Sequence, residues 1–177
     1  MKSRFPYQGI HIDLTWGLIG AEVDLHFRPP DGAGYSGYNY GNNCAYYNKN
    51  PDWGDHGYPD DNPVLNYDCI TTCADENIQL EEVGQNGIYK VVIHNFHNHG
   101  KGNATATVTV YYNGEQVALG RRTLANRGDS PEKGDVWIPY QVTVKQTGEV
   151  TVKNLDEVTV DNADDGAPFP KEEPGTY

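Results

Sequence analysis

The sequence predicts an all-β protein: a two-sheet antiparallel sandwich of about nine strands with a long irregular loop insertion. Short segments in which apolar and polar residues alternate recur along the chain, separated by turn residues. No window shows the periodicity of an amphipathic helix. The composition agrees, because 20 glycines and 13 tyrosines among 177 residues suit strands and loops better than helices.

Two strands are expected before the long loop. Residues 10–16 alternate, and residues 22–27 follow after a turn. Because successive side chains of a strand point to opposite faces, Asp24 and His26 share the face opposite the apolar side chains, where a hydrogen bond between them is expected. Pro29 ends the second strand, since proline cannot donate to a strand ladder. The apolar faces consist of Ile10, Ile12, Leu14 and Trp16 in the first strand and Val23, Leu25 and Phe27 in the second.

Further strands are expected after the loop. Segment 88–96 carries apolar residues on both faces, which is typical of a central strand. Asn113-Gly114 predicts a tight hairpin. In segment 137–145 one face is expected to hold Ile138, Tyr140, Val142 and Val144. The expected strands are 78–80, 88–96, 104–112, 116–119, 137–145, 150–152 and 158–160.

The chain divides into one domain and two terminal segments. Residues 1–9 form a short arm, residues 10–160 the sandwich domain, and residues 161–177 an acidic, proline-rich tail. Extended ends fray unless something holds them, so we expect both to contact neighbouring copies or a partner chain. The loop over residues 31–75 exceeds the roughly 12–15 residues of ordinary loops, which indicates a functional role. Its aromatic residues indicate that it is ordered.

The charge disfavours one class of partner. Lysine and arginine number 13 against 25 acidic residues, for a formal net charge of −12. A surface of this sign repels phosphate backbones, so no nucleic-acid partner is expected, whereas cations are favoured. No run approaches the roughly 18–20 apolar residues that span a bilayer, so no membrane insertion is expected. The segment after Met1 lacks a signal-peptide pattern, which fits a trimmed chain or a virion component.

Acidic residues concentrate in the second half of the long loop. Hard cations such as Ca²⁺ take 6–8 oxygen ligands from carboxylates and carbonyls. An ordered loop with many carboxylates would also repel itself without a counter-ion. Calcium is therefore a candidate cofactor, although the spacing differs from an EF-hand; a solvated acidic loop is the simpler alternative. The residues concerned are Asp52, Asp55, Asp60, Asp61, Asp68, Asp75 and Glu76.

Several short motifs occur in an order that resembles a known family. They are Asp24-Leu25-His26, Asn50-Pro51-Asp52-Trp53-Gly54, Asp61-Asn62-Pro63-Val64-Leu65-Asn66-Tyr67-Asp68, Glu76-Asn77-Ile78 and Gly87-Ile88-Tyr89-Lys90-Val91. Together they are similar to the YfaP-like (DUF2135) β-sandwich domain of bacterial surface and secreted proteins, over about residues 10–112.

The resemblance implies a non-catalytic module, similar to the calcium-dependent peptide-binding modules of bacterial adhesins. Asn66 and Cys69 stand where that family has carboxylates, whereas Asp75 adds one. The calcium ligands implied by position are Asp24, Asp61, Asp68 and Glu76, and Asp75 joins them as a candidate.

Three cysteines, Cys44, Cys69 and Cys73, cannot all pair within one chain. Cys69 and Cys73 lie where acidic residues of the family pattern are missing, so a disulfide between them could clip the turn that a metal would otherwise fix. Cys44 could equally pair with either, and buried thiols that act as small hydrophobic side chains are the remaining alternative.

Histidines and aromatic residues complete the candidate sites. His94, His97 and His99 could bind Zn²⁺, but no fourth ligand is evident, and solvent-exposed histidines at a hairpin end explain them as well. Tyrosine gives contact area at low entropic cost, so the loop aromatic residues form a binding surface or a small core beneath the loop. The candidates for a binding surface are Tyr46, Tyr47, Trp53 and Tyr67.

The sequence contains no nucleophile elbow, no HExxH motif and no phosphate-binding glycine loop. We therefore predict a non-enzymatic structural or binding module of an extracellular, cell-surface or virion-surface assembly. It would contact protein neighbours, including copies of itself, through its arms and the aromatic loop over residues 44–76. The alternative is a calcium-dependent adhesin domain that binds a peptide or glycan.

Overall fold

The structure, a computed structural model, describes residues 9–30, 42–70, 72–125 and 134–160. Within them the chain is all-β, with nine strands and one short 3-10 helix, η1 (Pro59–Asp61). The predicted fold class is therefore confirmed. The arm over residues 1–9 and the tail over residues 161–177 were both predicted to make contacts, and all of them except Gly9 lie outside the described residues. No helix in the described part has the length and apolar character needed to cross a bilayer.

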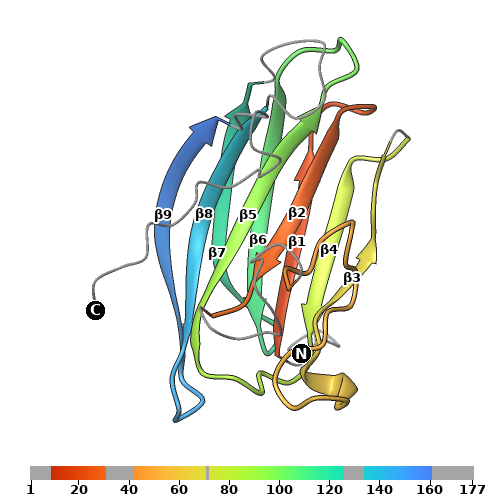
Figure 1. The fold of residues 1–177 in the computed structure, drawn as a ribbon. Coiled ribbons are helices and arrows are strands. Elements are labelled where there is room, and N and C mark those ends of the chain that lie inside the picture. Colours follow the sequence, from red (N-terminus) through yellow and green to blue (C-terminus); the bar gives the residue numbers. More distant parts are fainter. Residues whose placement is uncertain (1–8, 31–41, 71, 126–133, 161–177) are drawn as a thin grey trace, which may run out of the picture.

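The strands form two antiparallel sheets packed face to face (Figure 1). One sheet has the order β3-β4-β1-β6-β7 and the other the order β2-β5-β8-β9. The strands are β1 (Ile10–Trp16), β2 (Glu22–Arg28), β3 (Val64–Tyr67), β4 (Asp75–Leu80), β5 (Gly87–His97), β6 (Ala104–Tyr112), β7 (Glu115–Leu124), β8 (Asp135–Val144) and β9 (Val150–Val160).

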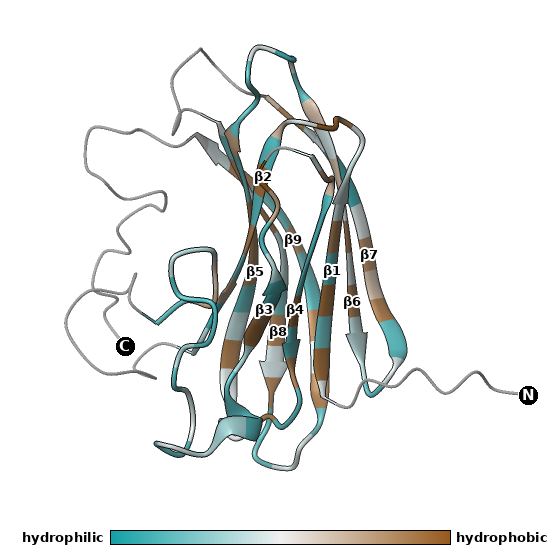
Figure 2. Ribbon diagram, turned by 90° about the vertical axis from the view of Figure 1, so that its right-hand side faces the viewer, coloured by the Kyte–Doolittle hydropathy of each residue, from teal (hydrophilic) through white to brown (hydrophobic). Residues whose placement is uncertain are grey.

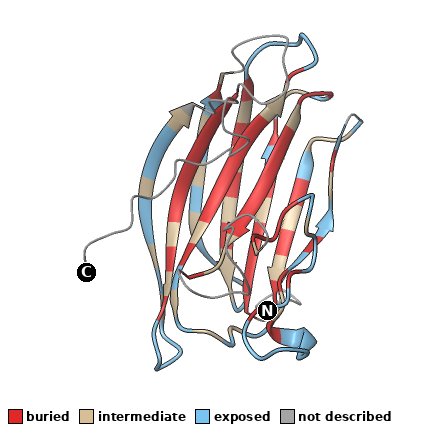
Figure 3. Cartoon of the chain, viewed as in Figure 1, coloured by how far each residue is buried: buried red, intermediate tan, exposed pale blue. Residues whose placement is uncertain are grey.

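The core lies between the two sheets and follows the predicted alternation. Figure 2 shows apolar bands that recur along the strands, and Figure 3 shows that burial concentrates on the central strands. Strand β5 is central, as predicted, because it pairs with both β2 and β8. The predicted hairpin is also present: Asn113 and Gly114 both have positive φ angles, as a type I′ turn requires. The inward side chains include Ile12, Leu14, Val23, Leu25, Phe27, Val91, Ile93, Val108 and Val110.

Three expectations about the strands were wrong in detail. Strand β3 lies inside the segment predicted to be irregular loop. Segments 150–152 and 158–160 belong to one strand, β9, which continues through Asp156 at a positive φ angle. Strand β8 has a bulge between Ile138 and Tyr140, so Ile138 faces the outer side of its sheet, and Trp137 faces the core instead. Pro139 lies at this bulge, where proline does not interrupt a strand ladder.

The loop between β2 and β4 is tied to the edge of the sandwich at Cys44 and is closed on itself by a disulfide. Cys44 pairs with Phe27 by two backbone hydrogen bonds of 2.9 and 3.0 Å, so the loop covers part of the free edge of β2. Cys69 and Cys73 form a disulfide, which is one of the pairings considered from the sequence. Cys44 remains a free thiol, is completely buried, and burial raises its pKa to about 12.

We predict that thiol labelling will reproduce this pattern. Alkylation of the folded protein should label none of the three cysteines, because Cys44 is buried and its thiolate is disfavoured. Alkylation after unfolding without reductant should label Cys44 alone, and alkylation after reduction should label all three, as mass spectrometry can count. Labelling of all three cysteines in unfolded, unreduced protein would contradict the disulfide.

Candidate functional site

Three carboxylates meet at the free edge of β2. Asp24 comes from β2, Glu76 from β4, and Asp68 from the loop between β3 and β4. One oxygen of each lies within 4.8 Å of the other two. The strand periodicity of two places Glu76 on the same face of β4 as Ile78 and Leu80, so its side chain points between the two sheets.

The Glu76 carboxylate connects the two sheets. One of its oxygens, Oε2, accepts a hydrogen bond from the Leu25 backbone amide of β2 at 2.8 Å. The other, Oε1, accepts one from the Cys69 amide at 3.1 Å. The amides of Leu25 and Phe27 point away from β5 and donate to Glu76 and Cys44, on the side of β2 where the described residues place no further strand of the sheet.

The electrostatics of this cluster leave a negative charge without compensation. Burial raises the pKa of Glu76 to about 8, although two amides donate to it, and the charges of Asp68 and Glu22 act in the same direction. Burial, followed by the charges of Glu76, Glu22 and Asp68, raises the pKa of Asp24 well above its usual value. Asp24 is 2% exposed, and its Oδ2 atom has no hydrogen-bond partner. A proton or a bound cation is needed to stabilise this arrangement.

The two histidines beside Asp24 do not carry a positive charge that could balance its carboxylate. His26 and His94 lie beside it, with ring nitrogens within 4.8 Å of its carboxylate. Burial lowers the pKa of His26 to about 3 and that of His94 to about 4, so both rings are neutral near pH 7. The Lys49 ammonium lies 2.9 Å from the outer carboxylate, Asp68, and half of the Lys49 side chain is exposed.

Two predicted calcium ligands lie elsewhere. Asp61, at the end of η1, accepts a hydrogen bond from the Asp55 amide at 2.7 Å. The Asp61 carboxylate packs against Gly54 and Gly84, where any Cβ atom would collide with it. Gly54 also has a positive φ angle, so Asp61 organises the turn around η1. Asp75 is exposed and, one position before Glu76, points to the other face of β4.

The predicted aromatic surface divides into exposed and buried members. Tyr46 and Tyr47 are 43% and 41% exposed, and their ring centroids lie 6.2 and 6.0 Å from that of His26. They therefore stand close to the carboxylate cluster. Tyr67 on β3 is also exposed. Trp53, in contrast, is buried against Phe27 and Tyr89 and donates to the Asn42 carbonyl, so it anchors the loop instead of contacting a partner.

The structure also gathers side chains that the sequence prediction kept apart. A β-bulge gives β5 one extra residue between two pairs of directly opposite residues, Asp24–His94 and Glu22–His97. His94 therefore belongs with Asp24 and His26, while His97 and His99 belong with Glu22. The predicted cluster of three histidines was thus wrong as a set. The alternation of Glu22, Asp24 and His26 was visible in the sequence, but the bulge was not.

A separate hollow of about 370 Å³ opens at the opposite end of the sandwich. Glycine backbone and a few polar side chains, including Glu81 and Lys145, line it. None of the predicted site residues is among its lining residues, and among the described residues no set of acidic or histidine side chains converges there, so the carboxylate cluster remains the stronger candidate.

Comparison with known proteins supports the fold alone. No protein-family profile and no curated protein matches the sequence. Among solved structures, the chain is similar to the unknown function protein SAV2460, with 12% sequence identity and a TM-score of 0.50. The similarity covers 89% of this chain and 93% of that one. At this identity the shared feature is the sandwich architecture, and the resemblance to the YfaP-like domain stays a prediction from motifs.

Proposed function

We propose that this protein is a non-enzymatic binding module whose loop between β2 and β4 is held by a calcium ion at Asp24, Asp68 and Glu76. The ion would fix the loop that carries Tyr46 and Tyr47, and these tyrosines would contact a protein or glycan partner. The observation that carries the proposal is the buried Oδ2 atom of Asp24, which lacks a partner and lies among three converging carboxylates.

The donor set favours a hard cation. The three side chains offer carboxylate oxygens, and the irregular loop around Asp68 and Cys69 can add backbone carbonyls and water, as Ca²⁺ requires. Hydrolysis is a poorer explanation for these carboxylates. Asp24 and Glu76 are each 2% exposed, and Glu76 already accepts two backbone hydrogen bonds, so neither carboxylate faces an open groove.

An extracellular or surface location fits two features of the site. The Cys69–Cys73 disulfide persists in oxidising compartments. Calcium sites of extracellular modules bind with dissociation constants of about 10⁻⁴–10⁻³ M, a weak affinity that three carboxylate ligands are enough to reach. The exposed tyrosines beside the site provide the contact area that a partner would need.

The calcium proposal predicts a melting temperature that depends on the ion. At a free Ca²⁺ concentration about 100-fold above the dissociation constant, binding should stabilise the folded state by about 2.7 kcal/mol. For a chain of this size that corresponds to a rise of roughly 5–10 °C in the melting temperature over the value in EDTA. Calorimetry of the full chain in both buffers measures the difference.

Two variants sharpen this test. Asp24→Asn should abolish the calcium response without lowering the melting temperature in EDTA, because the amide replaces a carboxyl group whose charged form is disfavoured by burial and by the neighbouring carboxylates. Asp75→Asn, the matched control on the exposed face of β4, should keep the response. Equal melting temperatures with calcium and with EDTA for the unmodified chain would overturn the proposal.

A second candidate function, a subunit that assembles with copies of itself, is favoured by edge strand β7. Within the part of the chain that the structure describes, this strand pairs with β6 alone, and it exposes Val117 and Leu119, the latter by 58%. An exposed edge with apolar side chains is a template for pairing with another chain. The partner we propose for this edge is the β7 edge of a second copy.

Sedimentation equilibrium of the full chain tests the assembly. We expect an oligomer, and we expect Leu119→Lys to weaken the association about tenfold or more, because it places a charge at the centre of the contact. Ile19→Lys, a charge added at an exposed apolar residue away from β7, should leave the association unchanged. A monomeric chain at all concentrations would contradict this function.

A further inference from the structure

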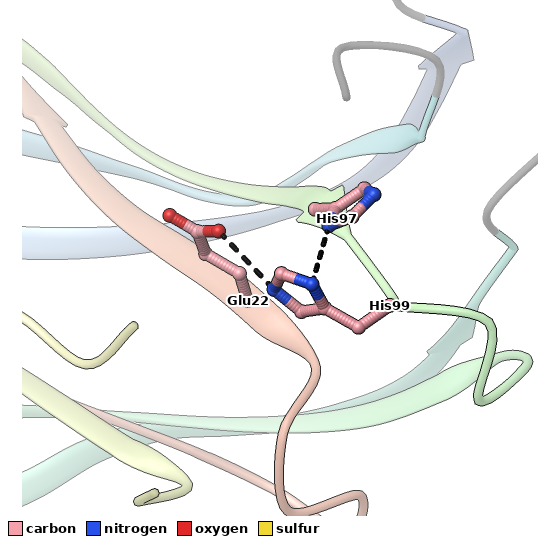
Figure 4. Close-up of side chains that lie close together, drawn as sticks. All are labelled: Glu22, His97 and His99. Carbon is pink, nitrogen blue, oxygen red and sulfur yellow. Dashed lines mark hydrogen bonds and ion pairs between the residues drawn. The ribbon is translucent and has the colours of Figure 1, made fainter. Parts of the chain in front are cut away.

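A second group of metal-binding side chains lies at the end of β2 and β5. Glu22, His97 and His99 converge there from the first residue of β2, the last residue of β5 and the turn that follows (Figure 4). We propose that these three residues form a zinc site, separate from the carboxylate cluster at Asp24, Asp68 and Glu76.

The backbone brings Glu22 and His97 together. They are directly opposite partners in the antiparallel pairing of β2 with β5, so their side chains stand side by side on one face of the sheet. The bulge between this pair and the pair Asp24–His94 makes the arrangement possible. Without the extra residue on β5, His94 and His97 would point to opposite faces, because their spacing is odd.

The turn after β5 then directs His99 back towards the strand. His99 has a φ angle of 49°, in the left-handed region that few residues other than glycine adopt. Asn98, which is buried, holds the turn: its side chain accepts a hydrogen bond from Gly100, and its carbonyl accepts one from Lys101, both at 2.9 Å. As a result the His99 ring lies against the His97 ring, with centroids 4.0 Å apart.

The ligand atoms are spaced as a small metal ion requires. The Nδ1 atoms of His97 and His99 lie 2.9 Å apart, and Glu22 Oε2 lies 3.7 Å from His99 Nε2. One nitrogen of each ring and one Glu22 oxygen all lie within 4.8 Å of one another. Two nitrogens on a tetrahedral Zn²⁺ are about 3.3 Å apart, so the two rings would have to separate slightly and turn until one His99 nitrogen faces both His97 and Glu22.

The chemistry of the set favours zinc over calcium. Imidazole nitrogens suit Zn²⁺, whereas Ca²⁺ prefers oxygen ligands alone. Two histidines and one carboxylate leave the fourth tetrahedral position to water, and His99, whose side chain is 36% exposed, gives solvent access to the site. Without metal, the same contact is a hydrogen bond in which one Nδ1–H donates to the other ring.

The neighbouring group of Asp24, His26 and His94 is the weaker zinc candidate. All three residues are buried, so an ion would have to lose its water completely and the strands would have to open for it to enter. Asp24 is also the residue that the calcium proposal uses. Zinc binding by His94→Gln and by His99→Gln distinguishes the two places.

Isothermal titration of untagged, metal-free full chain with Zn²⁺, in buffer with millimolar Ca²⁺, tests the proposal. We expect one Zn²⁺ bound per chain. His97→Gln and His99→Gln should each weaken binding about tenfold or more. His56→Gln, which changes an exposed histidine in the loop, is the matched control and should bind as the unmodified chain does. Circular dichroism confirms that each variant is folded.

Cobalt supplies a second readout. Co²⁺ in a tetrahedral nitrogen and oxygen site gives strong visible absorption, which should disappear in His99→Gln. Zinc binding that persists in both His97→Gln and His99→Gln, or that is lost in His94→Gln but kept in His99→Gln, would overturn the proposal. Asp24→Asn should retain zinc binding, so the experiments can refute the calcium site and the zinc site independently of each other.

Discussion

The carboxylate of Glu76 is the interaction on which the open side of the sandwich depends. It accepts the Leu25 amide of one sheet and the Cys69 amide of the loop, and so it holds β4, β2 and the disulfide-closed segment together. Both hydrogen bonds require an acceptor, which the ionised form supplies fully. Burial opposes the ionisation of Glu76, and the charges of Asp68 and Glu22 add repulsion. A cation at this point would let the ionised form persist.

Strand β2 distributes its residues between three tasks. Its inward side chains, Val23, Leu25 and Phe27, belong to the core. The side chains of Glu22, Asp24 and His26 lie on the opposite face. Backbone amides at its edge donate hydrogen bonds to Glu76 and Cys44. The bulge opposite Glu22 and Asp24 aligns two histidines of β5 with these carboxylates. Carboxylate oxygens gather on the loop side and the His97 and His99 rings at the strand end, which is why we propose two different cations for the two groups.

The sequence predicted what alternation and motif order encode. Alternation gave the sandwich, and the motifs gave Asp24, Asp68 and Glu76, which the structure brings together. The misses arose from features that alternation does not encode. Because of bulges in β5 and β8, the side chains of His94, His97 and Ile138 do not lie on the faces that simple alternation predicts. Asp61 packs against two glycines, away from the other predicted ligands. Trp53 was assigned to the binding surface but is buried, because composition does not distinguish an aromatic residue that anchors a loop from one that is exposed to a partner.

The central claim is that a hard cation binds between Asp24, Asp68 and Glu76. A crystal of the full chain grown with Tb³⁺, a calcium substitute with strong anomalous scattering, locates the ion directly. We expect an anomalous peak in contact with carboxylate oxygens of all three residues and Lys49 turned away from Asp68. A map with no peak among these carboxylates, or with its strongest peak elsewhere on the chain, would contradict the account.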